Sequence, residues 1–207
     1  TDPVTTTDEL IPSGETSSYR SNPERLSEFA LSRRDPQYVG RSKVMRQIER
    51  DREAGKALPE EVMKVYEALT KAGVANDPAN TDIGSTIFAN MPGDGSAREQ
   101  AASCQRVMGA SANFAKQYAT KRYRSNCINW GMTPFLVENP EVFELGDYIF
   151  VPGIREAVLE NKASFSAYAV KPDGTVTEFP VSTGALTEAE RQIIADGCLI
   201  NYYRNNQ

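Results

Sequence analysis

The chain has 207 residues, enough for one large domain, and its 40% apolar and 25% charged residues are ordinary values for a globular protein. A net charge of −5 argues against a nucleic-acid partner, because phosphate binding needs a surplus of cations. No apolar run approaches the roughly 20 residues that span a bilayer and no signal peptide opens the sequence, so a cytoplasmic protein is expected.

Two residue types limit the chemistry that the chain can perform. Cys104, Cys127 and Cys198 form neither a disulfide framework nor a C-x-x-C metal site, so reduced and mostly buried thiols are expected. The chain has no histidine, which removes the usual general base and the commonest metal ligand. The start at Thr1-Asp2-Pro3, without an initiator Met, is what a fragment or a processed product would show. A fragment would explain an incomplete site.

Residues 1–40 are rich in Thr, Ser, Pro and Gly, and on composition alone they favour an irregular linker. Helical periodicity is confined to a short stretch over residues 25–31. The β-branched run over residues 4–11 and the dense hydrogen-bonding groups over residues 17–23 are more specific than a plain linker needs.

Residues 41–75 are predicted to form a pair of helices. Val44 and Ile48, and later a second apolar set, recur at helical spacing with charges between them. Pro59 suits the first turn of the second helix, and Gly73 suits its end. The charged outer faces indicate a solvated surface, and no function is assigned to them.

From about residue 81 to residue 207 the pattern is that of an α/β core. Glycines end two predicted helices, and Thr187 with Glu190 forms a capping box that begins the final helix, expected to run to about Tyr203. The predicted strands cover residues 85–89, 111–115, 133–137, 147–151, 164–170 and 175–181. The other helices of this core are predicted over residues 97–108 and 119–130.

A glycine-rich loop over residues 93–100 is the best candidate for chemistry. Its glycines permit tight or left-handed backbone before a good helix-forming run, so the free N–H groups of the helix start would face an anion. Arg98 could add a fork that suits a carboxylate. Ser96 is expected at the cap, with its hydroxyl close to the same pocket.

The same spacing also fits a purely structural helix cap, and spacing alone favours that alternative. The loop is neither a Walker loop, since no Gly-Lys-Ser/Thr follows, nor a dinucleotide fingerprint, since the third Gly is missing. A His-activated serine is impossible within this chain. Ser96 could act as a base only if helix N–H groups and an arginine stabilised its alkoxide in a closed, water-poor site. Such a site needs a second wall.

The run Gly95-Ser96-Ala97-Arg98-Glu99 resembles the Gly-Ser-Ser-Arg-Glu motif in the C-terminal swivelling domain of the aconitase superfamily. The resemblance implies that Ser96 is the catalytic base and that Arg98 binds a substrate carboxylate. The family's second serine, which also touches substrate, is Ala97 here, so the identity of the substrate is left open.

Two further matches lie in the Thr/Ser-rich segment. Thr6-Thr7-Asp8 resembles the family's Thr-Thr-Asp motif, which brings an aspartate to the active site, although the residue that follows is Glu9 rather than the usual His. Arg20 stands at the offset from Asp8 at which the family carries a substrate-binding arginine. By this resemblance Asp8 is catalytic, with a structural turn as the alternative. Residues 1–40 then form an active-site wall rather than a linker.

Residues 122–135 resemble the family's run from a helix into the following strand, and residues 143–147 resemble its next turn. The resemblance therefore covers nearly the whole chain. It implies one α/β swivelling domain over residues 1–207, with a mixed sheet or partly open barrel-like core flanked by helices in β/β/α layers.

The reaction implied by the resemblance is reversible dehydration and hydration of a hydroxy-di- or tricarboxylate. The family's preceding domains hold a [4Fe-4S] cluster whose open iron assists the departing hydroxyl. This chain lacks the C-x-x-C pair among that cluster's ligands, so the cluster must lie elsewhere. The expected partners are cluster-binding domains in cis or a large subunit in trans, as in isopropylmalate isomerase. An RNA-binding module without catalysis is the alternative from another class.

Overall fold

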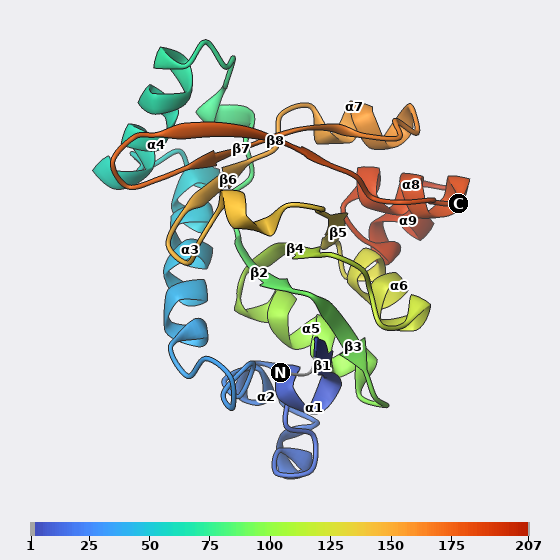
Figure 1. Ribbon diagram of the computed structural model, residues 1–207. Coiled ribbons are helices and arrows are strands. Elements are labelled where there is room, and N and C mark those ends of the chain that lie inside the picture. The colour runs from blue at the N-terminus through green and yellow to red at the C-terminus, as the bar shows by residue number, and fades with distance from the viewer. Residues whose placement is uncertain (1–2, 207) are drawn as a thin grey trace.

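The computed structural model describes residues 3–206, and Thr1, Asp2 and Gln207 lie outside the described residues. Short strands and helices follow one another along the chain (Figure 1). The helices are α1 (Thr7–Leu10), α2 (Pro23–Ser27), α3 (Tyr38–Glu53), α4 (Glu60–Lys71), α5 (Arg98–Met108), α6 (Lys121–Asn129), α7 (Ile154–Leu159), α8 (Glu188–Asp196) and α9 (Leu199–Asn205). The strands are β1 (Val4–Thr6), β2 (Ser85–Ala89), β3 (Met91–Asp94), β4 (Ala110–Ala115), β5 (Thr133–Leu136), β6 (Tyr148–Phe150), β7 (Phe165–Val170) and β8 (Val176–Val181).

The described strands form three small sheets. β1 pairs in parallel with β3, the strands β2, β4 and β5 form a parallel sheet in that order, and β6, β7 and β8 form an antiparallel one. A single bridge between Leu136 and Ser182 links the last two sheets. The expected mixture of parallel and antiparallel pairing is therefore confirmed. The expected partly open barrel takes the form of separate sheets, and no closed barrel is formed by residues 3–206.

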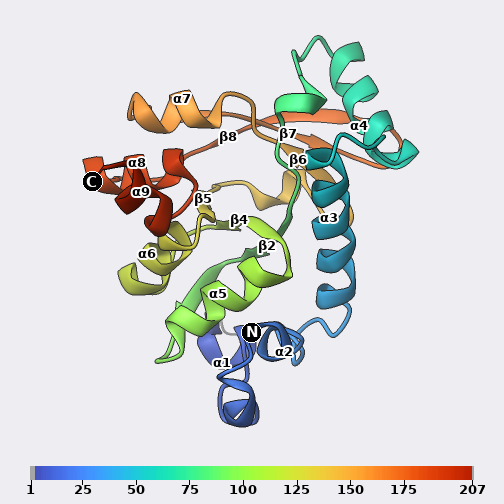
Figure 2. The same ribbon diagram turned by 180° about the vertical axis from the view of Figure 1, so that it is seen from behind.

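The helical pair expected over residues 41–75 is confirmed as α3 and α4. Pro59 is the cap that precedes α4 rather than a residue of its first turn. In both ribbon views α3 runs along one side of the molecule, from the N-terminal elements to the antiparallel sheet, where α4 also lies (Figures 1 and 2). None of the described helices is both long and apolar enough to cross a bilayer.

The strands and helices predicted over residues 81–207 are confirmed to within one or two residues, with one exception. The final helix, expected to run unbroken from the Thr187 cap, ends at Gly197 and restarts as α9. Gly197 has φ +90, a left-handed conformation that ends an α-helix. The capping box of Thr187 and Glu190 is present as predicted.

Residues 1–40, expected to be irregular, contain β1, α1, α2 and the 3-10 turn Ser17–Tyr19 in their described part. One apolar cluster joins them to α5 and α6. Leu10 and Ile11 are fully buried, as are Ala101 and Ala102 on the facing side of α5. Small alanine side chains on α5 let the N-terminal elements approach it closely. This cluster fixes where the two predicted motifs meet.

A glycine contact anchors α6 to the C-terminal helices. Gly131 has φ +77, and a Cβ there would overlap the backbone carbonyl of Gly197. Gly55 has a similar φ of +73 with open space around it.

We predict that Gly131→Ala destabilises the protein by about 1–3 kcal/mol more than Gly55→Ala. Both changes place a side chain in a left-handed conformation, which costs about 1–2 kcal/mol, but only the first forces backbone apart. Denaturant unfolding of the two variants measures the difference. Equal losses would show that the contact between Gly131 and Gly197 contributes nothing.

Candidate active site

Pairing of β1 with β3 brings the two predicted motifs together. The strands run parallel, with Val4 opposite Met91 and Thr6 opposite Asp94. Sequence analysis assigned residues 93 and 94 to a loop, whereas they end β3. Because the strands are parallel, both end at the same edge of this small sheet. β1 continues into α1, and β3 continues toward α5. The Thr-Thr-Asp and Gly-Ser-Ala-Arg runs therefore lie at one edge, although they are far apart in the sequence.

Thr7 and Gly95 lock the two runs against each other. Gly95 has φ +128, and a Cβ on it would overlap the Oγ1 atom of Thr7, a residue that is only 2% exposed. Glycine is required here both by the backbone conformation and by the close approach of Thr7. The Thr7 hydroxyl thus occupies the space that the side chain of any residue other than glycine at position 95 would need.

The start of α5 is open. Its cap residue is Ala97, and no side chain accepts a hydrogen bond from the first turn. Ser96 was expected to be that cap; it instead lies one residue earlier, exposed, and makes no hydrogen bond with any residue that the structure describes. The free N–H groups of the first turn carry the positive end of the helix dipole, which favours an anion.

Arg98 follows directly and is half-buried. Its Nε atom is buried without a hydrogen-bond partner, and within residues 3–206 its guanidinium forms no ion pair. The neighbouring carboxylate of Glu99 does not compete for it, since that group accepts a hydrogen bond from the Trp130 indole at 3.0 Å. Arg98 is therefore available to a carboxylate from outside the chain.

Ala97 has a different environment from its neighbours. It is 8% exposed and belongs to the apolar cluster beneath α5 that also contains Leu10 and Ile11. A serine here would bring a hydroxyl into this apolar cluster. The methyl group suits packing, while Ser96 and Arg98 on either side remain accessible to a ligand.

Arg20 also lies near the start of α5. It is exposed, forms no ion pair within the described part of the chain, and lines a small crevice together with Gln100 of α5. The crevice also contains Ile11 and Thr16, so the stretch after α1 carries Arg20 across to this helix. Ser96, Arg98, Asp8 and Arg20 therefore gather around one end of α5.

A network of buried polar groups packs against the glycine-rich loop at Gly93. The Tyr123 ring packs against Gly93, where a Cβ would overlap it. The Tyr123 hydroxyl donates to Gln105 of α5 at 2.9 Å and accepts from Asn113 of β4 at 3.1 Å. Thr120 donates to the Gly93 carbonyl at 3.0 Å. Burial of these groups rigidifies the loop, because polar partners without water must keep their geometry.

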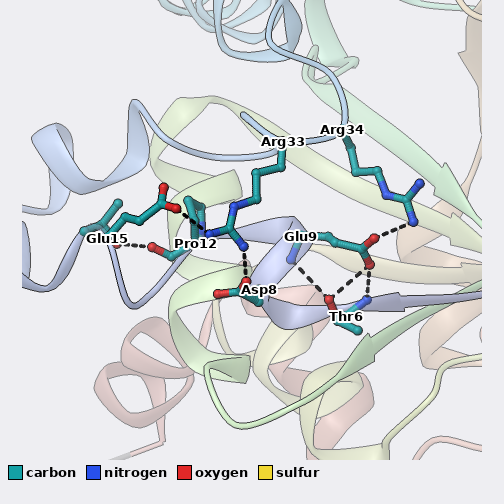
Figure 3. Close-up of polar contacts among 8 residues, drawn as sticks. Thr6, Asp8, Glu9, Pro12, Glu15, Arg33 and Arg34 are labelled. Carbon is teal, nitrogen blue, oxygen red and sulfur yellow. Dashed lines mark hydrogen bonds and ion pairs between the residues drawn. The ribbon is translucent and has the colours of Figure 1, made fainter.

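Two consecutive acids at the start of α1 meet two consecutive arginines (Figure 3). Arg33 forms an ion pair with Asp8 through Nη1 and another with Glu15 through Nη2, the latter at 2.6 Å. Arg34 forms an ion pair with Glu9. Hydrogen bonds to the two carboxylates raise the pKa of Arg33, with Glu15 the stronger influence.

Glu9, the residue at which the resemblance departs from the family, caps α1. Its carboxylate accepts from the Thr6 backbone N–H at 2.7 Å and from the Thr6 hydroxyl at 3.0 Å, while that hydroxyl accepts from the Glu9 N–H at 3.3 Å. Burial raises the pKa of Glu9, but the Thr6 hydrogen bonds and the attraction of Arg34 outweigh it, so the pKa is lowered. Glu9 is thus held ionised in a capping box.

The gathered residues form an open surface rather than an enclosed pocket. A larger groove lies elsewhere, between α3, α4, β2 and β6, and none of the candidate residues lines it. Among the described residues, no three of His, Cys, Asp and Glu are grouped to hold a metal ion, and Cys104 and Cys127 are buried free thiols. Chemistry at this surface needs a second wall from another domain or chain.

Sequence reasoning missed the arginine pair and the Tyr123 network. The adjacent acids at residues 8 and 9 and the adjacent arginines at 33 and 34 were a visible charge match, but such matches are common and rarely indicate contact. The buried polar groups gave no signal, because Tyr123, Gln105 and Asn113 fit the helical and strand patterns without their partners being evident.

Comparison with known proteins adds two likenesses, while no family model matches the chain. The chain is 29% identical over 133 residues to the methanogen homoaconitase small subunit of Methanocaldococcus jannaschii, covering 64% of this chain and 69% of that protein. It is also similar in structure to a 3-isopropylmalate dehydratase from the same organism, with a TM-score of 0.53 at 18% identity. That likeness covers 97% of this chain and 87% of the other, and it bears on the fold alone.

We predict that Glu9→Gln lowers stability at pH 7 by about 0.5–1 kcal/mol, because glutamine keeps the cap acceptor but loses the charge. The folded-state pKa of Glu9 lies below its usual 4.5, so its contribution is present above that value. It is lost as the pH falls through the lowered pKa.

Wild type and Glu9→Gln should therefore converge in melting temperature as the pH is lowered from 6 toward about 3. Thermal melts across this range provide the measurement. A difference that does not change with pH would refute the charge contribution.

Proposed function

We propose that the chain is a swivelling domain of the aconitase superfamily and supplies one wall of the active site of a hydro-lyase, which the homoaconitase small-subunit relative and the dehydratase-like fold support. The reaction is reversible removal and addition of water on a hydroxy-di- or tricarboxylate. Residues 1–207 form one swivelling domain in this proposal, and the enzyme acts in the cytoplasm. The observation that carries the proposal is the pairing of β1 with β3, which joins the Thr-Thr-Asp run to the Gly-Ser-Ala-Arg loop.

Ser96 is the proposed base. Its alkoxide takes the proton from the carbon α to a substrate carboxylate, the electron pair of that C–H bond forms the double bond, and hydroxide leaves from the neighbouring carbon. An alkoxide needs nearby positive charge, and the uncapped start of α5 with the unpaired Arg98 supports that role. In the reverse direction the Ser96 hydroxyl returns the proton. The departing hydroxide must be assisted by groups outside this chain.

Arg98 and Arg20 are the proposed carboxylate ligands. Both lack ion pairs within the described residues, and both lie near the start of α5. Two guanidinium groups without internal partners suit a substrate with two or more carboxylates, because each planar fork can bind one of them in a bidentate way. Ala97 packs in the apolar cluster, so we assign it a packing role at the site rather than a polar contact with substrate.

Asp8 is proposed to orient a group contributed by the opposite wall. Half of the Asp8 side chain is exposed, while Arg33 forms an ion pair with one of its two carboxylate oxygens. An aspartate with one side anchored and the other open is suited to accept a hydrogen bond from a partner. This assignment makes Asp8 an active-site residue that is complete only after assembly.

The [4Fe-4S] cluster of the superfamily is proposed to lie in the partner. The residues of this chain do not fit such a cluster, since Cys104 and Cys127 are buried as free thiols and the described residues contain no group of three or more His, Cys, Asp or Glu that could hold a metal ion. The small-subunit relative supports a large subunit in trans, and cluster-binding domains in cis are the other arrangement.

The substrate class follows from the two arginines, and its members differ in chain length and substituents. Activity of the complete, cluster-reconstituted enzyme toward citrate, isocitrate, homocitrate and the isopropylmalates would identify the hydroxy acid. A complete enzyme with no activity on any hydroxy-di- or tricarboxylate would refute the proposed function.

We predict that Ser96→Ala in the complete enzyme lowers kcat by at least ~10²-fold, since loss of a general base typically costs ~10²–10⁴. Substrate binding should persist, because the arginines are unchanged. Steady-state kinetics with a separate measurement of substrate Kd tests this. Turnover within about tenfold of wild type would exclude Ser96 as the base.

Arg98→Lys should raise KM by about tenfold or more, because an ammonium group cannot reproduce the planar fork. Steady-state kinetics of the same enzyme tests this change, with Arg25→Lys as the matched control. Arg25 is exposed and lies over the Tyr19 ring. An unchanged KM for Arg98→Lys would contradict contact with a substrate carboxylate.

A further inference from the structure

The two arginines that contact α1, Arg33 and Arg34, follow directly after a strained turn. Leu31 has φ +57, which is unusual for a residue with a side chain, and it is only 7% exposed. Its backbone N–H donates to the Leu10 carbonyl at 2.9 Å, which ties the turn to the end of α1. The Leu31 carbonyl in turn accepts hydrogen bonds from the backbone N–H groups of Arg34, at 2.9 Å, and Asp35, at 2.8 Å.

Such a conformation persists only where the surroundings impose it, and it directs the residues that follow. Leu31 is held in the apolar cluster with Leu10, so the turn cannot relax without loss of packing. The consequence is that Arg33 and Arg34 project onto the first turn of α1, where Figure 3 shows them reaching Asp8 and Glu9.

We propose that Arg33 is a positioning residue that aims the Asp8 carboxylate at the opposite wall of the active site. The inference deepens the proposed function and rests on the role of Asp8 in it. Arg33 itself touches no substrate. It acts by holding one carboxylate oxygen of Asp8 while the other remains open.

Glu15 is part of this arrangement. Arg33 uses one terminal nitrogen for Asp8 and the other for Glu15, so the guanidinium is fixed at both ends and its plane is set. A single ion pair would allow the Asp8 carboxylate to rotate with the arginine. A guanidinium braced by Glu15 leaves Asp8 with little freedom, which is the requirement for a group that must meet a partner in one geometry.

The same contact has different consequences before and after assembly. In the free chain the side chains of Arg33 and Asp8 are 42% and 51% exposed, so water screens the pair and it contributes little to folding. A covering wall would remove that water, and electrostatic interactions strengthen as the local dielectric constant falls. Arg33 should therefore matter much more for turnover than for stability.

Arg34 is a matched control from the same turn. It is exposed to a similar degree, 54%, and pairs with the adjacent acid. Its partner Glu9 is already held by the Thr6 capping box, so Arg34 orients no free carboxylate. A structural role of the turn would affect both arginines alike, whereas the proposed role distinguishes them.

The experiment compares Arg33→Gln, Arg33→Lys, Arg34→Gln and Ser96→Ala in the complete enzyme, by kinetics and thermal denaturation. For Arg33→Gln we expect kcat to fall at least about tenfold, with KM within about twofold and Tm within about 2 °C of wild type. Arg33→Lys should recover part of kcat because it keeps the charge. Arg34→Gln should leave kcat within about twofold.

A double-mutant cycle gives the second test. If Arg33 acts through Asp8, then Asp8→Asn combined with Arg33→Gln should have the same kcat as Asp8→Asn alone, within about twofold. Multiplying effects would show that Arg33 acts independently and would overturn the proposal. So would an unchanged kcat in Arg33→Gln, a rise in KM alone, or equal losses of kcat and Tm in Arg33→Gln and Arg34→Gln.

The Ser96→Ala arm separates the two levels of inference. If Ser96→Ala retains full turnover, Ser96 is not the base and the proposed active site at the start of α5 fails, and the role of Arg33 at that site fails with it. If Ser96→Ala abolishes turnover while Arg33→Gln matches wild type, the proposed function stands and only the positioning role is refuted.

Discussion

The arrangement of the site depends on one backbone contact, the parallel pairing of β1 with β3. These strands are short and form a sheet of their own, so they could not persist without the apolar cluster that joins α1 and α2 to α5. Their register sets Thr6 opposite Asp94, and this register in turn brings Thr7 against Gly95. A shift of β1 by one residue would break the close contact between Thr7 and Gly95.

The contacts that support the candidate site lie within the chain itself. Tyr123 and Thr120 hold Gly93 from below, Ala97 anchors the loop in apolar packing, and the turn at Leu31 directs Arg33 onto α1. Few of these supports face solvent. Rigidity of this kind lowers the cost of ordering the loop when a second wall covers it. The groups left open are those for which the chain has no partner of its own.

Several arginines of this molecule are paired with acids of the same chain, whereas Arg98 and Arg20 are not paired with any described residue. The cations along α3, such as Arg41, Arg46 and Arg52, form ion pairs with nearby acids. Arg98 and Arg20 have none within residues 3–206, although the chain carries a net charge of −5 and acids are plentiful. A buried guanidinium nitrogen without a partner is costly, which makes the unpartnered Nε of Arg98 unusual. Other arginines, among them Arg50, Arg106 and Arg122, also form no ion pair with the described residues, so the place of Arg98 and Arg20 near the start of α5 and the motif resemblance carry the assignment.

The sequence by itself determined the local elements and the motif residues. Periodicity, the Thr187 capping box and the glycine after α5 act over a few residues, so they predicted strands and helices closely. Tertiary structure decided that β3 exists, that Ala97 rather than Ser96 caps α5, and that the last helix breaks at Gly197. It also decided that Arg33 holds Asp8. These features depend on contacts between distant segments, whose burial and close approach leave no periodic trace in the residues themselves.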